Sequence, residues 1–411
     1  MTTSESSDTA QPAGEQASSP AKRGVRFRFG TRWLLAVVTV CGVALGVAFH
    51  PWWNLYREVE IAEQITQHGG SVTFDYTSPD GETPQTSWDW IFQQIAGARP
   101  GHVQSCTLIG ENVTAGDLPL LAELPQLSRV RLQGEGITDQ ELDALANVTS
   151  LREVELDETA IFDPRTIKSL GKIPTLETLV CRGENIGDKE VREISQFPKL
   201  KSLTLESSWC TTWGMQDLKS SKTLQHLELI HCQSVGSYSV ELISELPNLR
   251  SFALADLDLG DLYSASEVMQ GIARASALES LSTTQINVCP GDLSRLEPLD
   301  NLHHLSLHRC YVRDPQVAEL TKLDSLEWLD LSANRITDVS IPSLLALPKL
   351  RYVDLSQTEL TAAGVKQLTT HPGLETIAFS AAGYQGPGKI TTPEIEAITK
   401  ANPQLSIVWQ P

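Results

Sequence analysis

The chain has 411 residues, and its 32 Lys+Arg against 51 Asp+Glu give a formal net charge of -19. Residues 1–32 hold five basic and three acidic residues, so the remainder carries 27 basic against 48 acidic residues, a net charge of -21. So acidic a body repels phosphate backbones and shows no basic stripe, which argues against nucleic-acid binding.

The first 28 residues are mainly small and polar, which predicts a disordered cytoplasmic tail over residues 1–28. An uncharged stretch of 17 residues follows at 33–49, with tryptophans near both ends. Its length is near the minimum that crosses a hydrocarbon core, and tryptophan is typical of both interfaces. We therefore expect one transmembrane helix within 29–53. Because basic residues precede it, the N-terminus should be cytoplasmic and the rest of the chain outside the cytoplasm.

Two other interpretations of this stretch remain open. It has the form of a cleaved signal peptide with Gly46-Val47-Ala48 as the small-x-small site. A lipoprotein signal ending at Cys41 fits less well, because Val40 stands where a small residue is expected. The long region ahead of the stretch and the tryptophan pair after it favour the anchor.

Residues 54–100 predict a juxtamembrane helix and an N-terminal capping segment. The pattern indicates a helix over 56–67, a Gly69-Gly70 turn, an edge strand over 71–76 and a second helix near 88–95. A stack of repeats needs its first unit covered, so we expect this segment to close the repeats that follow.

From residue 101 to residue 411 an LxxLxL unit recurs, mostly every 24 or 25 residues. Val103 takes the first position one step ahead of the regular units, and a partial unit starts at Leu405. The regular units start at Leu127, Leu151, Leu176, Leu200, Leu224, Leu249, Leu278, Leu302, Leu326, Leu350 and Leu374. A fixed period of this length predicts a solenoid.

Each unit is interpreted as a strand, a turn and a short helix. Alternation along the strand points its fourth and sixth residues into the core. Five units place an aspartate ahead of a helical apolar pattern, where it predicts a helix N-cap. These are Asp139, Asp163, Asp188, Asp314 and Asp338. Burial of each leucine contributes roughly 1.5–3 kcal/mol, and only stacking on a neighbour achieves it.

The pattern, as in LEWLDLSANRITD at 326–338, resembles the leucine-rich repeat family. The resemblance implies an α/β solenoid, a leucine-rich repeat horseshoe with a parallel concave β-sheet and convex helices, here preceded by one transmembrane helix. GGSVTFDY at 69–76 and ITD at 336–338 further resemble bacterial single-pass membrane-anchored leucine-rich repeat proteins. The family usually has Asn after the strand. Here that position holds Asn334, Thr159, Thr358, Cys232 and Cys310.

The stretch GYQGPGKIT at 383–391 is one residue short of a phosphate-binding loop. Such a loop needs Ser or Thr directly after its Lys, but Ile390 follows Lys389. Thr392 and Pro393 predict the N-cap and first residue of a downstream helix. We interpret the stretch as a Gly/Pro-rich insertion in the last full repeat, and keep a nucleotide-binding enzyme as the alternative.

The segment HHLSLHRC at 303–310 suggests metal binding or catalysis. On a strand, His304 and His308 share a face but lie about 13 Å apart, too far for one metal ion. Ser306, His304 and Asp330 can be arranged as a hydrolase triad, yet no nucleophile turn accompanies them. We expect no catalytic residue, metal or cofactor.

The seven cysteines form no CxxC pair, and we interpret them mainly as buried free thiols. Cys106 and Cys181 occupy inward strand positions, and Cys210 takes an apolar place after its strand. Cys210 with Cys232 is the pair that comes nearest to a disulfide.

The concave surface offers a candidate interface. His304, Trp328 and Tyr352 fall on three adjacent strands, with Asp330 and Asp354 beside them. Exposed aromatic rings are the residues that anchor interfaces. An earlier strand is acidic and is interpreted as a solvated face; it carries Glu153, Glu155 and Asp157.

The sequence thus predicts a non-enzymatic, membrane-tethered recognition protein. Its concave face would bind a protein or peptide outside the cytoplasm through the residues just named, and no small-molecule substrate is expected. A passive structural protein of the cell envelope is a further alternative.

Overall fold

The structure is a computed structural model of a chain with two compact units, Met1–Asn54 and Leu55–Pro411. The structure describes residues 39, 56–75, 102–109, 116–133, 139–157, 164–232, 234–256, 265–380 and 390–410. Within these ranges no helix has the length and apolar character to span a bilayer. The stretch 33–49, apart from Thr39, lies outside them, as do the helix expected near 88–95, Thr159 and Asp163.

One sheet runs through the second unit, and its 14 described strands follow one another in chain order. β1 pairs antiparallel with β2, and every later strand pairs parallel with the strand before it. The strands are β1 Ser71–Asp75, β2 His102–Ile109, β3 Arg129–Gln133, β4 Glu153–Asp157, β5 Thr178–Arg182, β6 Ser202–Glu206, β7 His226–Ile230, β8 Ser251–Ala255, β9 Ser280–Thr284, β10 His304–His308, β11 Trp328–Asp330, β12 Tyr352–Asp354, β13 Thr376–Ser380 and β14 Ser406–Gln410.

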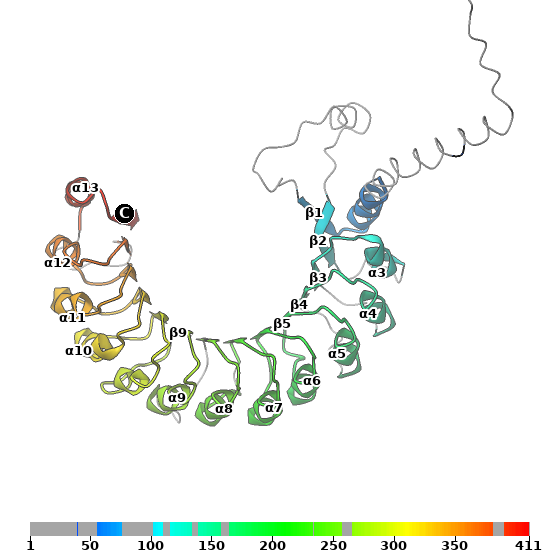
Figure 1. The fold of residues 1–411 in the computed structure, drawn as a ribbon, viewed down its shortest axis with the longest axis horizontal. Helices are drawn as coiled ribbons and strands as arrows, with labels where there is room; N and C mark the ends of the chain where they lie inside the picture. The colour runs from blue at the N-terminus through cyan, green and yellow to red at the C-terminus, as the bar shows by residue number, and fades with distance from the viewer. Residues whose placement is uncertain are drawn as a thin grey trace, which may run out of the picture. The chain divides into compact units, whose positions relative to one another are not determined.

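Short helices cover one side of this sheet. In Figure 1 the second unit curves into an arc with strands along its inner edge and helices along its outer edge. The helices are α3 Asp117–Leu120, η2 Leu121–Glu123, α4 Asp139–Leu145, α5 Pro164–Leu170, α6 Asp188–Ile194, α7 Thr212–Leu218, α8 Ser237–Ile243, α9 Ala265–Ile272, η3 Leu293–Leu296, α10 Asp314–Glu319, η4 Leu320–Lys322, η5 Asp338–Ser340, α11 Ile341–Leu345, α12 Ala362–Leu368 and α13 Thr392–Ala401. Helices this short are unstable alone, so packing against the sheet must hold them.

The repeated apolar positions form one continuous core between sheet and helices. In one unit, Leu326, Leu329, Leu331, Ile336 and Leu344 are each 0% exposed. The predicted inward direction of the fourth and sixth strand residues is therefore confirmed. Each unit presents the same set to its neighbours, so the core extends along the whole arc.

The position after the strand holds a polar group that bonds to backbone. The amide of Asn334 donates to the carbonyls of Leu307 at 2.7 Å and Leu331 at 2.9 Å. Its oxygen accepts the N–H of Val312 at 2.9 Å. Asn334 therefore joins its own unit to the preceding one, where the strand has ended and backbone groups need partners.

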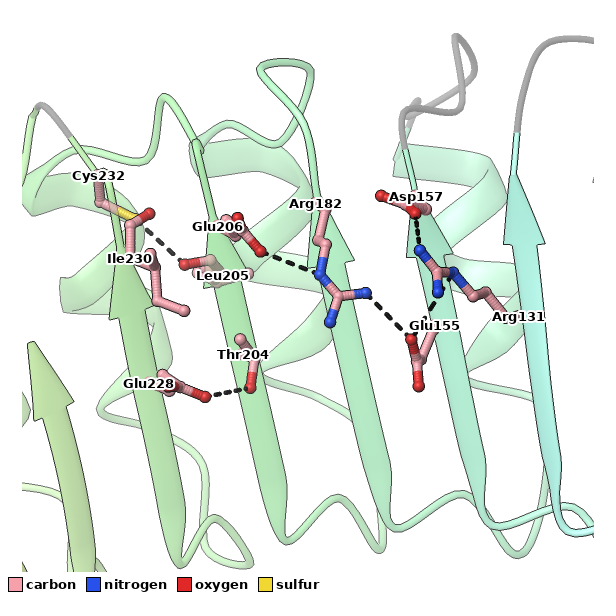
Figure 2. A network of polar contacts seen from close by, with 10 residues as sticks. All are labelled: Arg131, Glu155, Asp157, Arg182, Thr204, Leu205, Glu206, Glu228, Ile230 and Cys232. Carbon is pink, nitrogen blue, oxygen red and sulfur yellow. Dashed lines mark hydrogen bonds and ion pairs between the residues drawn. The ribbon is translucent and has the colours of Figure 1, made fainter. Parts of the chain in front are cut away.

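In two other units a cysteine at this position bonds to the backbone of the preceding unit. The thiol of Cys310 donates to the carbonyl of Thr283 at 3.3 Å. The thiol of Cys232 donates to the carbonyls of Leu205 and Ile230, both at 3.4 Å (Figure 2). A thiol is a weaker donor than an amide, so these units keep the contact in a weaker form.

The six cysteines in the described residues are all free thiols, so the pair Cys210–Cys232 forms no disulfide. Five of them are buried and Cys289 is exposed. Burial raises the pKa of Cys106 and of Cys181 to about 12 in each case. Both thiols therefore stay protonated at neutral pH, as expected for core residues.

The prediction that aspartates cap the helices is wrong. Asp188, Asp314 and Asp338 are the first helical residues, and the N-caps of α6 and α10 are Gly187 and Arg313. Asp139 likewise begins α4, so its place is one residue later than predicted. The sequence signal located the helix starts correctly but misassigned what the carboxylates bind.

These carboxylates bind the next unit instead. Asp314 accepts the N–H of Thr337 at 2.9 Å and its hydroxyl at 2.8 Å. Asp338 accepts the N–H of Thr361 at 2.9 Å and pairs with its hydroxyl. The threonine is the N-cap of its own helix. Each such contact therefore fixes the turn of one unit from the unit before it, and Asp188 does the same to Thr211.

The N-terminal end of the solenoid is closed by a helix over residues 56–67 and by β1. Glu58 on this helix is 1% exposed. Its carboxylate accepts the N–H of Val103 at 2.9 Å and contacts Nδ1 of His102 at 2.9 Å. Because an antiparallel strand and a buried carboxylate cover β2, the first parallel strand has no bare edge.

Candidate functional site

Three rings form a column on neighbouring strands of the sheet. Backbone register places His304 opposite Trp328, and Trp328 opposite Tyr352. The centroids of His304 and Trp328 are 3.8 Å apart with planes at 9°, and those of Trp328 and Tyr352 are 4.9 Å apart at 3°. We call these three residues the aromatic column. The predicted adjacency is confirmed, and the rings also stack face to face.

All three rings are half-buried, which affects the two that ionise. Desolvation lowers the pKa of His304, although the charge of Asp330 acts in the opposite direction. Desolvation raises the pKa of Tyr352, and the charges of Asp354 and Asp330 raise it further. Both rings are therefore neutral at neutral pH, and the column is an uncharged, partly apolar surface.

Two carboxylates lie beside the column. Asp330 and Asp354 are register partners on β11 and β12, and we call them the acid pair. Asp330 accepts the hydroxyl of Ser306 and the N–H of Ser332, both at 2.8 Å. Asp354 accepts the N–H of Ser356 at 2.8 Å. These bonds fix the orientation of both carboxylates, and no Lys or Arg pairs with either one in the described part of the chain.

The hydrolase arrangement considered from the sequence lacks its central contact. Ser306 binds Asp330, whereas Nδ1 of His304 contacts the hydroxyl of Ser280 at 3.2 Å. His304 stacks on Trp328 and does not bridge the other two groups. The three residues are neighbours on the sheet without forming a proton relay.

The histidine-rich strand also shows no metal centre. Nδ1 of His308 contacts the hydroxyl of Ser332 at 2.8 Å, and His304 contacts Ser280. Among the residues that the structure describes, no group of three His, Cys, Asp or Glu side chains is placed to hold a metal ion.

The Gly-rich stretch 383–391 lies outside the described residues up to 389. The helix after it, α13, has Thr391 as N-cap, one residue earlier than predicted, and Pro393 in its first turn. The N–H and hydroxyl of Thr391 donate to the carboxylate of Glu394 at 2.9 and 2.7 Å. A carboxylate thus already binds at the helix end that a phosphate loop would offer to its ligand.

A separate charged network covers the first half of the concave face (Figure 2). Arg182 reaches Glu155 and Glu206, each at 3.0 Å. Arg131 pairs with Asp157 and lies 3.9 Å from Glu155. Arginines from both neighbouring strands thus form ion pairs with the acidic strand, which was interpreted from the sequence as a solvated face without partners. Arg131 and Asp157, and Arg182 and Glu155, are 26 and 27 residues apart, so these pairs lie diagonally across neighbouring strands.

Exposed aromatic residues outside the column were not singled out from the sequence. Trp209, Trp213 and Tyr238 are 61%, 75% and 58% exposed. Trp213 and Tyr238 are each the second residue of their helix, in α7 and α8. They lie apart from the concave face, so they provide matched controls for substitutions in the column.

The model of the leucine-rich repeat region family matches residues 102–384, well over half of the chain. Together with the parallel register and the repeated core, this match shows that the chain belongs to the leucine-rich repeat family. That fold is consistent with a protein-binding module. A search of the curated proteins found no match.

Several solved structures are similar to the chain. One is an internalin (inlF) from Listeria monocytogenes, with 19% identity and a TM-score of 0.47 over 77% of this chain and 92% of that one. The structure of TLR13 with ssRNA13 gives 24% identity and 0.46 over 64% and 39%. The yeast Rad7–Elc1 complex gives 15% identity and 0.46 over 91% and 97%. The family membership itself rests on the family model and the repeat geometry.

Proposed function

We propose that this leucine-rich repeat protein is a membrane-tethered, non-catalytic recognition module. Residues 33–49 would anchor it, with the N-terminus in the cytoplasm and the solenoid outside. The concave face would bind a protein or peptide through the aromatic column and the acid pair. The observation that carries this proposal is the column itself, three stacked rings on a solvent-facing sheet.

The energetics favour an interface at this place. Rings held in one orientation by stacking lose little conformational freedom when a partner binds. Aromatic residues also supply a large share of the binding energy at protein interfaces. The bonds to Ser306, Ser332 and Ser356 hold the acid pair in place. The surface is therefore organised before any partner arrives.

A capture experiment tests the proposal. The full-length chain in detergent micelles serves as bait for an envelope extract, beside the Trp328→Ala/Tyr352→Ala variant. We expect a partner that binds the native chain and is lost from the variant, because each truncated anchor costs about 2 kcal/mol or more. Trp213→Ala/Tyr238→Ala, which removes two exposed rings elsewhere, should capture it normally.

Each other result has a clear meaning. Equal capture by all three chains would show that the aromatic column is not part of the interface. Capture by none would favour a passive structural role. The topology is tested separately with a reporter fused after Pro411, which should be active outside the cytoplasm only. A cytoplasmic signal would refute the proposed orientation.

A further inference from the structure

We propose that the partner contributes a basic side chain, most favourably an arginine, which binds between the aromatic column and the acid pair. This inference rests on the proposed function, because it names the chemistry of the partner for the same surface. It follows from a difference in ion pairing between the two halves of the concave sheet.

Most carboxylates on the concave face of the first half form ion pairs with arginines of the same sheet. Glu155 and Glu206 share Arg182, Asp157 pairs with Arg131, and Glu153 lies 2.8 Å from Arg129. Every one of these carboxylates has a cation from a neighbouring strand. Glu228 on β7 instead accepts the hydroxyl of Thr204 at 3.1 Å.

Within the ranges that the structure describes, the acid pair in the second half has no such ion pairs. From β9 to β13 the strand residues on the concave face include no Lys or Arg. Asp330 and Asp354 are direct register partners, so like charges stand on strands about 4.8 Å apart. Like charges opposite one another are unfavourable in a sheet. A cation bound between them relieves that repulsion, and among the described residues no Lys or Arg forms an ion pair with either carboxylate.

The acid pair also has unused acceptor capacity. Asp354 uses Oδ1 for the N–H of Ser356. Its Oδ2 makes no hydrogen bond with any residue in the described ranges. Asp330 uses each oxygen once, for Ser306 and Ser332, and a carboxylate oxygen accepts two bonds. The planar fork of a guanidinium supplies donors that match this arrangement.

The rings favour the same ligand. Trp328 lies between the other two rings, so both of its faces are covered. Tyr352 has one face on Trp328, and its other side borders β13, where its register partner is the small residue Thr376. Cations bind over aromatic faces, and arginine stacks on them better than lysine. The Tyr352 face and the Asp354 carboxylate thus stand together as one cation site.

Fluorescence anisotropy with defined peptides tests this inference on the full-length chain in micelles, at about 0.15 M salt. The probes are labelled nonapeptides that alternate glycine with arginine, lysine or glutamate. We expect saturable binding of the arginine peptide, weaker binding of the lysine peptide and none of the glutamate peptide. In Asp330→Asn/Asp354→Asn, affinity for the arginine peptide should fall about tenfold or more.

The asparagine variant keeps an oxygen for the N–H groups of Ser332 and Ser356, so it removes charge and not the turns. Asp324→Asn/Glu396→Gln removes the same two charges from exposed positions elsewhere. It should bind like the native chain, within about twofold.

Equal losses in both variants would show attraction to the overall negative charge and would overturn the inference. So would equal binding of the glutamate peptide, or no binding below about 1 mM. If the partner in the envelope extract still needs Trp328 and Tyr352 but tolerates Asp330→Asn/Asp354→Asn, this inference falls while the proposed function stands.

Discussion

Asp314 shows how a single side chain can serve the unit after its own. It accepts the N–H and hydroxyl of Thr337 and also pairs with the hydroxyl of Ser340. The sequence indicated an N-cap because Asp stands at the start of a helical pattern. The assignment failed because Arg313, the residue before it, is the N-cap of α10, and propensity cannot show a contact made across a period of 23 residues.

We predict that Asp314→Ala lowers the free energy of unfolding by about 2 kcal/mol, because three donors lose a charged acceptor. Asp324→Ala, an exposed aspartate in a nearby turn, should change it by less than about 0.5 kcal/mol. Urea unfolding followed by circular dichroism measures both. Equal effects of the two substitutions would contradict the role assigned to Asp314.

The aromatic column is positioned by the register of strands β10, β11 and β12. The sequence alone was sufficient here, because a constant 24-residue step fixes the register and brings His304, Trp328 and Tyr352 into line. It was not sufficient for ring orientation, which depends on side-chain packing. It also missed the pairing of Arg131 and Arg182 with the acidic strand, since those contacts cross diagonally between strands.

The acid pair on strands β11 and β12 should favour binding at some cost in stability. We expect Asp330→Asn/Asp354→Asn to raise the free energy of unfolding by about 0.5 kcal/mol, because like charges on neighbouring strands no longer repel. The substitution that weakens peptide binding should thus stabilise the fold. Thermal unfolding of Asp330→Asn/Asp354→Asn measures this change in stability, with Asp324→Asn as the control. A lower melting temperature would mean that the carboxylates serve the fold rather than a ligand.

At the scale of the molecule the solenoid is a one-dimensional stack, in which each unit touches only its neighbours. Its first parallel strand, β2, depends on the helix over residues 56–67, whose Glu58 carboxylate accepts the N–H of Val103. The helix and β1 lie where the sequence indicated them, because an amphipathic pattern and a Gly-Gly turn are local signals. The contact between Glu58 and His102 spans 44 residues and had no such signal.

We predict that Glu58→Ala destabilises the N-terminal units before the rest. It leaves a buried N–H without its acceptor, which costs about 1–3 kcal/mol. Hydrogen exchange followed by mass spectrometry should show faster exchange over residues 102–133. Exchange over 302–356 should be unchanged, since damage in a linear stack decays with distance. Uniform acceleration along the chain would show that the solenoid unfolds as one unit.

The contacts from Asp188, Asp314 and Asp338 all point the same way, from an earlier unit to the threonine of a later one. A polypeptide emerges during synthesis with its N-terminus first, and its domains fold in that order. Each of these carboxylates has therefore already been synthesised when the threonine that binds it appears. The direction of translation and the direction of these contacts coincide.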